Sequence, residues 1–276
     1  MAELPARLEI ACTNGDLPQA RSLYIELFAQ HPLTERRPML TQMATIAAKN
    51  KDPSILSFCF SEGLKLDPEN VNDPLIRAAC SSGSIETVRV LLDNGMDVNK
   101  YLELDGSPLV SACYAGNVPL ARYLLDEGAD PNIGYPCGDY EALVWAIVGS
   151  NASLELVELL LARGTVVKGT GALIAAAENG NIGAVKLLLE HGEKTGDLAL
   201  EEIEEWGGYD DRKLDDQGPA LYKAAANGHP AIVELLLGKG ADPTHGDRTG
   251  RSPADIAEKN EHWDSARTLR SLGTGR

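Results

Sequence analysis

The stretch SPLVSACYAGNVPLARYLLDEGADPN, from Ser107 to Asn132, decides the fold because its pattern recurs along the chain. Segments that begin at Asp73, Thr170 and Gly218 follow the same order of residue types. Each has a turn with a small residue or proline, a short helical pattern with a pair of small residues, a glycine, a second helical pattern with a Leu-Leu pair, and a closing glycine. Such self-similarity is typical of repeat proteins, in which each helix pair packs on its neighbours.

The residue types explain why this pattern should fold as helix pairs. In the segment from Thr170, Ala176 and Ala177 are small enough to let neighbouring helices approach closely. We expect Gly180 to end the first helix and Gly192 the second, because glycine readily adopts the positive φ found at helix C-termini. Valine and leucine residues at helical spacing in the second helix form an apolar stripe for packing.

These residues resemble the ankyrin repeat, whose pattern runs as a β-turn, a T-P-L-H-like helix start, Ala-Ala, Gly-His, V-x-x-L-L and G-A-D-x-N. The best matches are GNVPLARYLLDEGADPN, which ends at Asn132, and NGHPAIVELLLGKGADP, which ends at Pro243. The resemblance implies an all-α fold, an ankyrin-repeat α-solenoid of helix-turn-helix repeats with short β-turn or hairpin connections and a concave groove. Tetratricopeptide repeats have a similar period, but their aromatic signature is absent.

We expect one solenoid of eight repeats over residues 1–276. The first two repeats are degenerate, and the last carries charge where an inner repeat is apolar, as is typical of ends that face water. The expected helix pairs lie near residues 5–30, 41–63, 74–95, 108–128, 141–164, 171–192, 219–240 and 252–272.

An acidic insertion separates the sixth and seventh repeats. Gly192 and Gly240 are 48 residues apart, about fifteen more than the ankyrin period. Residues 193–218 hold ten acids and three bases, a charge of −7 out of −16 for the whole chain. Leu200, Ile203 and Trp206 lie at helical spacing, which predicts an inserted helix over 197–208. One interpretation is a solvated decoration; the other is an acidic wall beside the groove that selects a basic partner segment.

Composition restricts the function classes. The apolar content of 43% suits a globular chain, and the net charge of −16 disfavours nucleic acid and anionic membranes as partners. No secretion signal or membrane-spanning stretch is visible, so we expect a cytoplasmic protein, with the nucleus as a second possibility.

The cysteines and histidines indicate structure rather than chemistry. The five cysteines lack the spacing of zinc ligands and are odd in number, so we expect free thiols, no metal site and no cofactor. Cys12, Cys80 and Cys113 share one repeat position, which predicts small buried side chains. His229 and His262 follow the break between two helices, where we expect them to cap the second helix.

The resemblance implies that the groove, lined by the first helices and the turns, binds other proteins. Tyrosine and tryptophan make good anchors there because they join a rigid ring to a polar tip. Core packing is the alternative interpretation of Trp145. The candidate partner-binding residues are Tyr101, Tyr114, Tyr135, Tyr140, Trp145, Glu178, Asn179, Trp206, Tyr209, Tyr222, Asn227 and Arg251.

The leading functional hypothesis is therefore a non-catalytic protein-interaction scaffold, expected to be a monomer and not an enzyme. The alternative is a solenoid adapted to small-molecule binding or catalysis, with residues 193–218 as a lid over an aromatic and acidic pocket. Tyr114, Glu178, Asp210 and Tyr222 would then be the candidates for acid–base chemistry. A third hypothesis is a structural adaptor that multimerises, although the charged last repeat opposes stacking.

Overall fold

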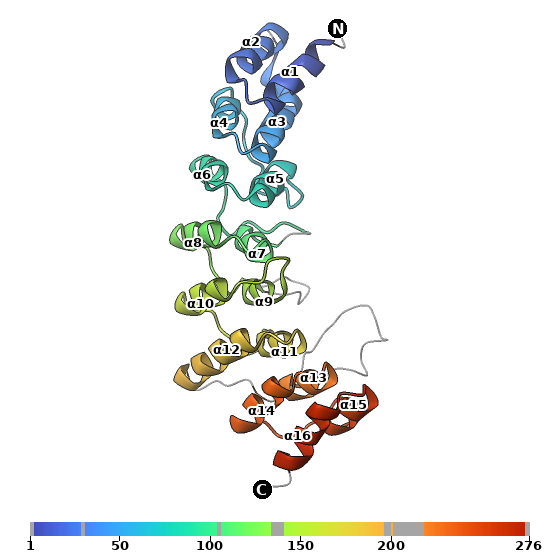
Figure 1. Ribbon diagram of the computed structural model, residues 1–276. Coiled ribbons are helices and arrows are strands. Elements are labelled where there is room, and N and C mark those ends of the chain that lie inside the picture. The colour runs from blue at the N-terminus through green and yellow to red at the C-terminus, as the bar shows by residue number, and fades with distance from the viewer. Residues whose placement is uncertain are drawn as a thin grey trace. The chain divides into compact units, whose positions relative to one another are not determined.

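The computed structural model describes residues 3–28, 31–103, 106–133, 141–195, 200 and 218–273. These residues form sixteen helices, labelled in Figure 1, and no strand. The prediction of an all-α fold built from helix-turn-helix repeats is therefore confirmed. Among the described helices, none is both long and apolar enough to cross a membrane.

The chain divides into two compact units, which we describe separately. The N-terminal unit, Met1–Asp130, holds four helix pairs. The first helices of these pairs contact one another in sequence, and so do the second helices, which gives two layers (Figure 1). The pairs are α1 Glu3–Thr13 with α2 Leu17–Phe28, α3 Leu33–Lys49 with α4 Pro53–Ser61, α5 Pro74–Ser82 with α6 Ile85–Asp93, and α7 Pro108–Tyr114 with α8 Val118–Asp126.

The C-terminal unit, Pro131–Arg276, repeats this arrangement with its own four pairs. Its first helices again form one layer and its second helices the other. We call these rows the first-helix layer and the second-helix layer of each unit. The pairs are α9 Ala142–Val148 with α10 Leu154–Ala162, α11 Ala172–Glu178 with α12 Ile182–Thr195, α13 Ala220–Ala226 with α14 Pro230–Gly238, and α15 Pro253–Lys259 with α16 Trp263–Gly273.

Local chemistry explains where the helices begin. The Ser107 hydroxyl accepts a hydrogen bond from the Val110 backbone N–H, and proline follows at the first helical position of α7. Asp73 caps α5 in the same way through the N–H groups of Leu75 and Ile76. Because a cap satisfies backbone donors that the helix leaves unpaired, these residues determine where the first helices start.

The predicted small residues lie at the contacts between first helices. Ala176 and Ala177 in α11 are fully buried, as are Ala224 and Ala225 in α13, which packs on α11. Larger side chains at these positions would push the helices apart, since protein interiors are close-packed.

A second kind of contact joins successive repeats. Gly180 has φ +69, and the His229 ring of the next repeat packs closely against it. A Cβ added at Gly180 would lie only 2.6 Å from His229 Cε1, so a larger residue would displace the ring. His229 Nε2 also donates a hydrogen bond to the Glu178 carbonyl at 3.1 Å. Gly228 receives the His262 ring in the same way. The prediction that His229 caps its own helix is wrong, since it makes no cap hydrogen bond on α14.

The acidic insertion leaves this contact unchanged. Gly180 and the His229 ring that packs on it are 49 residues apart, whereas the equivalent pair, Gly228 and His262, is 34 residues apart. Helices α11 and α13 pack together, as do α13 and α15. The predicted inserted helix over 197–208 lies outside the described residues apart from Leu200.

One boundary beside the insertion differs from the prediction. Gly192 does not end the second helix, because α12 continues to Thr195 and Gly192 is buried within it. Glycine inside a helix costs only about 1 kcal/mol relative to alanine. The extended turn makes compensating contacts, since Glu193 forms an ion pair with Lys239 and the Thr195 hydroxyl bonds to the His191 carbonyl.

Replacing Gly180 by alanine should therefore cost more stability than the strain of a left-handed alanine backbone alone. A left-handed backbone costs a residue with a Cβ roughly 1–2 kcal/mol, and the His229 ring must also move. We expect the free energy of unfolding, measured with urea, to fall by at least about 1 kcal/mol more in Gly180→Ala than in a strain-matched control.

Gly164→Ala supplies that control, because Gly164 has φ +85 and an added Cβ would meet no atom within 4 Å. Equal losses of stability in the two variants would show that the His229 contact contributes nothing.

Candidate functional site

The first-helix layer of the N-terminal unit carries the exposed aromatic residue Tyr114. It is the last residue of α7, and its side chain is 50% exposed. Tyr114 follows the buried Cys113 as Ser81 follows the buried Cys80 in α5. The two residues therefore occupy the same repeat position on neighbouring first helices.

A pocket of about 440 Å³ lies on α3 and α5 of this layer, and Ser81 is part of its lining. Its polar groups are unusual for an acidic chain, since Lys49 and Arg77 line it and no carboxylate does. Asn72 accepts a hydrogen bond from Arg77 and donates one to the Glu103 carboxylate. The lining consists of Thr45, Lys49, Asn72, Pro74, Arg77, Ala78, Ser81 and Ser82.

Sequence reasoning missed this basic surface, although a local signal was present. Helix α3 contains three cations and one acid, and Arg77 is the only charged residue of α5. The acid excess of the whole chain concealed this local reversal of charge.

In the C-terminal unit, three predicted site residues lie at the C-terminal ends of first helices. The Glu178 carboxylate pairs with Lys223 of the next first helix at 3.1 Å. The Asn179 and Asn227 side chains are directed to their own helices, where each amide donates to a backbone carbonyl four residues earlier. Both asparagines remain exposed. Glu178 and Lys223 therefore form an ion pair in this layer, which the sequence analysis did not predict.

Tyr222 differs from the expectation that it lines a groove, and it shares a buried acceptor with Arg251. Tyr222 is fully buried, and its hydroxyl donates to Asp247 Oδ2 at 2.8 Å. Arg251 Nε lies 3.1 Å from the same oxygen, and the Arg251 backbone N–H donates to Asp247 Oδ1. A buried tyrosine cannot contact a partner, so we correct the assignment of Tyr222. Tyr222 and Arg251 together hold the turn before α15 around a buried carboxylate, and the partly exposed Arg251 remains a predicted partner contact.

The environment of Asp247 lowers its pKa. Burial alone would raise the pKa, but the hydrogen bonds from Thr249, the Arg251 backbone and Tyr222, with the Arg251 charge, outweigh it. Because the folded pKa lies below the unfolded one, ionised Asp247 stabilises the fold above the unfolded pKa of about 3.9. This contribution is lost as the pH falls through the folded pKa.

Asp247→Asn should therefore lower the free energy of unfolding at pH 7 by about 2 kcal/mol, since it removes an ionised acceptor of several hydrogen bonds. Urea unfolding at pH 7 and at pH 3 measures the free energy of unfolding of both proteins. The difference in this free energy between wild type and Asp247→Asn should be smaller at pH 3 than at pH 7. Tyr222→Phe removes one hydrogen bond and should cost about 1 kcal/mol. If the difference in free energy of unfolding between wild type and Asp247→Asn is the same at pH 7 and pH 3, the carboxylate does not have this role.

The remaining predicted site residues divide into two groups. Tyr101 is half-buried in the connection between α6 and α7, where its hydroxyl lies 3.5 Å from the Glu103 carbonyl. Trp145 is also half-buried, between the buried Val144 and Ala146 of α9, so it is neither wholly core nor wholly surface. Four candidates lie outside the described residues: Tyr135, Tyr140, Trp206 and Tyr209. The same holds for Asp210.

The cysteines that the structure describes carry buried thiols: Cys12, Cys59, Cys80 and Cys113. Burial raises the pKa of Cys12 to about 11 and that of Cys113 to about 12, with smaller effects of Asp52 and Glu9 on Cys12. Burial also raises the pKa of Cys59. Within the described ranges, no group of three or more His, Cys, Asp and Glu side chains is placed to hold a metal ion.

These thiols should be inert at neutral pH, because the thiolate is the reactive form. We expect iodoacetamide at pH 7.5 to leave Cys12, Cys59 and Cys113 unlabelled in the native protein and to label them in urea. Peptide mass spectrometry resolves the sites. Rapid labelling of native Cys113 would contradict the assigned burial.

The stacked helix pairs define a helical repeat protein, and the sequence comparisons identify its kind. One family model, described as ankyrin repeats (3 copies), matches residues 44–134, and another, described as ankyrin repeats (many copies), matches residues 173–237. The two ranges together span more than half of the chain. The chain therefore belongs to the ankyrin-repeat family. Ankyrin repeats are generally protein–protein interaction modules. A search of curated proteins found no match to the chain.

Proposed function

We propose that the chain is a non-catalytic scaffold that binds another protein or peptide across its first-helix layers. Tyr114 carries this proposal, because it is a half-exposed aromatic side chain whose equivalent in the previous repeat, Ser81, lines a pocket. Aromatic residues with a polar tip are frequent anchors of interfaces. The general role of ankyrin repeats supports the same function.

The charges suggest what the partner carries. Lys49 and Arg77 line the pocket on α3 and α5 without a carboxylate among its lining residues, which favours an acidic group of the partner there. The insertion of residues 193–218 has the opposite sign, so a basic partner segment remains our prediction for that region. The other proposed contacts remain Tyr101, Trp145, Glu178, Asn179, Asn227 and Arg251.

We also propose a monomer in the cytoplasm or the nucleus. Asp264, Arg267 and Arg270 of α16 are exposed charges, and stacking a second copy on the last repeat would have to desolvate them. The free thiols of the described cysteines support a reducing compartment.

Tyr114→Ala tests the proposed contact surface. We expect partner capture, quantified by mass spectrometry on immobilised protein, to fall at least tenfold, as is usual when a central aromatic anchor is removed. The thermal midpoint should shift by less than about 2 °C, because truncating an exposed side chain has little effect on stability.

Two further variants make the result specific. Arg77→Glu should weaken capture of the same protein, because it reverses a charge in the neighbouring pocket. Ile25→Ala, which truncates an apolar side chain that is 46% exposed on the second-helix layer, should leave capture unchanged. If neither Tyr114→Ala nor Arg77→Glu alters any captured protein, the first-helix layer of this unit is not the binding surface.

A further inference from the structure

A second pocket of the N-terminal unit lies away from the first-helix pocket and shares none of its lining residues. It occupies about 570 Å³ between the segments that follow α4 and α6. Small-molecule sites commonly have volumes of about 300–1,000 Å³, with apolar walls and a few polar groups. Size and position therefore make this pocket a candidate for a ligand other than a protein partner.

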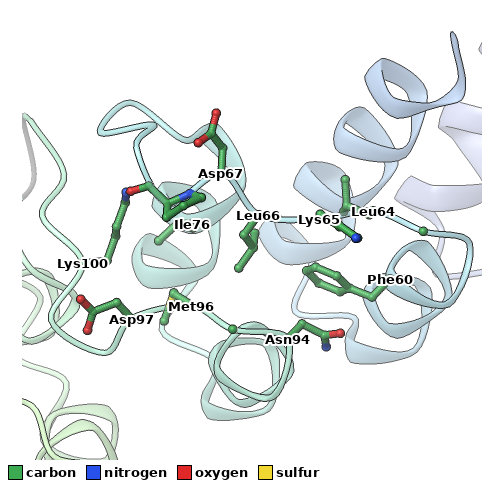
Figure 2. A pocket seen from close by; sticks show the side chains of 13 residues that line it. Phe60, Leu64, Lys65, Leu66, Asp67, Ile76, Asn94, Met96, Asp97 and Lys100 are labelled. Carbon is green, nitrogen blue, oxygen red and sulfur yellow. The ribbon is translucent and has the colours of Figure 1, made fainter. Parts of the chain in front are cut away.

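The walls of the pocket are mainly apolar. Ile76 and Met96 are 1% and 6% exposed, and Leu66 and Phe60 are partly buried. Figure 2 shows Leu66, Ile76 and Met96 gathered in the middle of the view, with Phe60 on one side and Lys100 on the other. An apolar group of a ligand would thus be surrounded by aliphatic carbon.

Lys100 is the unusual member of this lining. Lys100 is only 8% exposed, and its ammonium donates a hydrogen bond to the Pro68 backbone carbonyl. An ammonium has three donors, and Lys100 forms no ion pair with a carboxylate of the described residues. A buried cation is costly unless an anion and hydrogen bonds compensate it.

The two acidic residues of the lining do not supply that anion. Asp67 and Asp97 are exposed, and one oxygen of each accepts a backbone N–H two residues further along its own turn. In Figure 2 both carboxylates point away from Leu66 and Met96. They stabilise the two connecting turns and do not pair with Lys100, so an anionic ligand could bind its ammonium.

From this juxtaposition we propose that the pocket binds a small amphipathic carboxylate. The carboxylate accepts a charge-assisted hydrogen bond from Lys100 Nζ, and the apolar chain lies against Leu66, Ile76 and Met96. A single ammonium balances the charge of a carboxylate, whereas a phosphate carries close to two negative charges at neutral pH. This site is independent of the proposed protein-binding surface.

Octanoate is a suitable probe, with 1-octanol as its neutral match. We expect octanoate to shift the amide resonances of Met96 and Lys100 in ¹⁵N–¹H spectra of the full chain, with saturation in a titration. Octanol should bind at least tenfold more weakly, because it lacks the charged hydrogen bond. Equal affinities would show that Lys100 plays no part, and resonance shifts confined to other residues would overturn the pocket assignment.

Lys100→Met tests the cation directly, and Lys65→Met is its control. Lys65 lines the same pocket but is exposed. We expect Lys100→Met to weaken octanoate at least tenfold and Lys65→Met to change it less than twofold, with octanol binding maintained in both. Equal octanoate affinity in wild type and Lys100→Met would overturn the proposal. If Lys100→Met does not fold, the octanoate and octanol comparison on the wild-type chain decides.

Discussion

A glycine with positive φ at the end of a first helix receives a polar side chain from the next repeat, as Gly83 receives Asn117 and Gly180 receives His229. The same side chains donate hydrogen bonds to backbone carbonyls: Asn117 to that of Gly83 itself at 3.0 Å, and His229 to that of Glu178 at 3.1 Å. This contact determines both the separation and the register of successive repeats. The small residues of the first helices can be buried only because the register brings them together.

The candidate surface follows from that register. Residues at one repeat position line up along a first-helix layer, so a change of side chain at this position alters the surface without altering the fold. Tyr114 and Glu178 occupy the same position in different units, one as an exposed ring and the other as the partner of Lys223. Where the glycine is present, its contact forms the shared part of the repeat, and the position two residues before it is where the side-chain chemistry varies.

The sequence was sufficient for features that depend on nearby residues. The order of small residues, glycines and helical apolar stripes predicted the helix pairs, because caps and left-handed glycines act within a few residues. Contacts between repeats were harder to predict. The burial of Tyr222 depends on Asp247, 25 residues away, and the role of His229 depends on Glu178. The pocket around Lys100 depends on two connecting segments that the repeat pattern treats as equivalent turns.

The unchanged contact across the insertion has a consequence for how such a chain can vary. Helix α12 packs on α10, α11 and α14, and helix α13 packs on α11, α14 and α15, so the repeats fix where the segment between α12 and α13 starts and finishes. The entropy cost of closing a flexible loop rises by only about 0.6 kcal/mol for each doubling of its length. The junction is therefore a permissive point, where a lineage or a designer can exchange a whole segment of sequence while the repeats on both sides keep their shape.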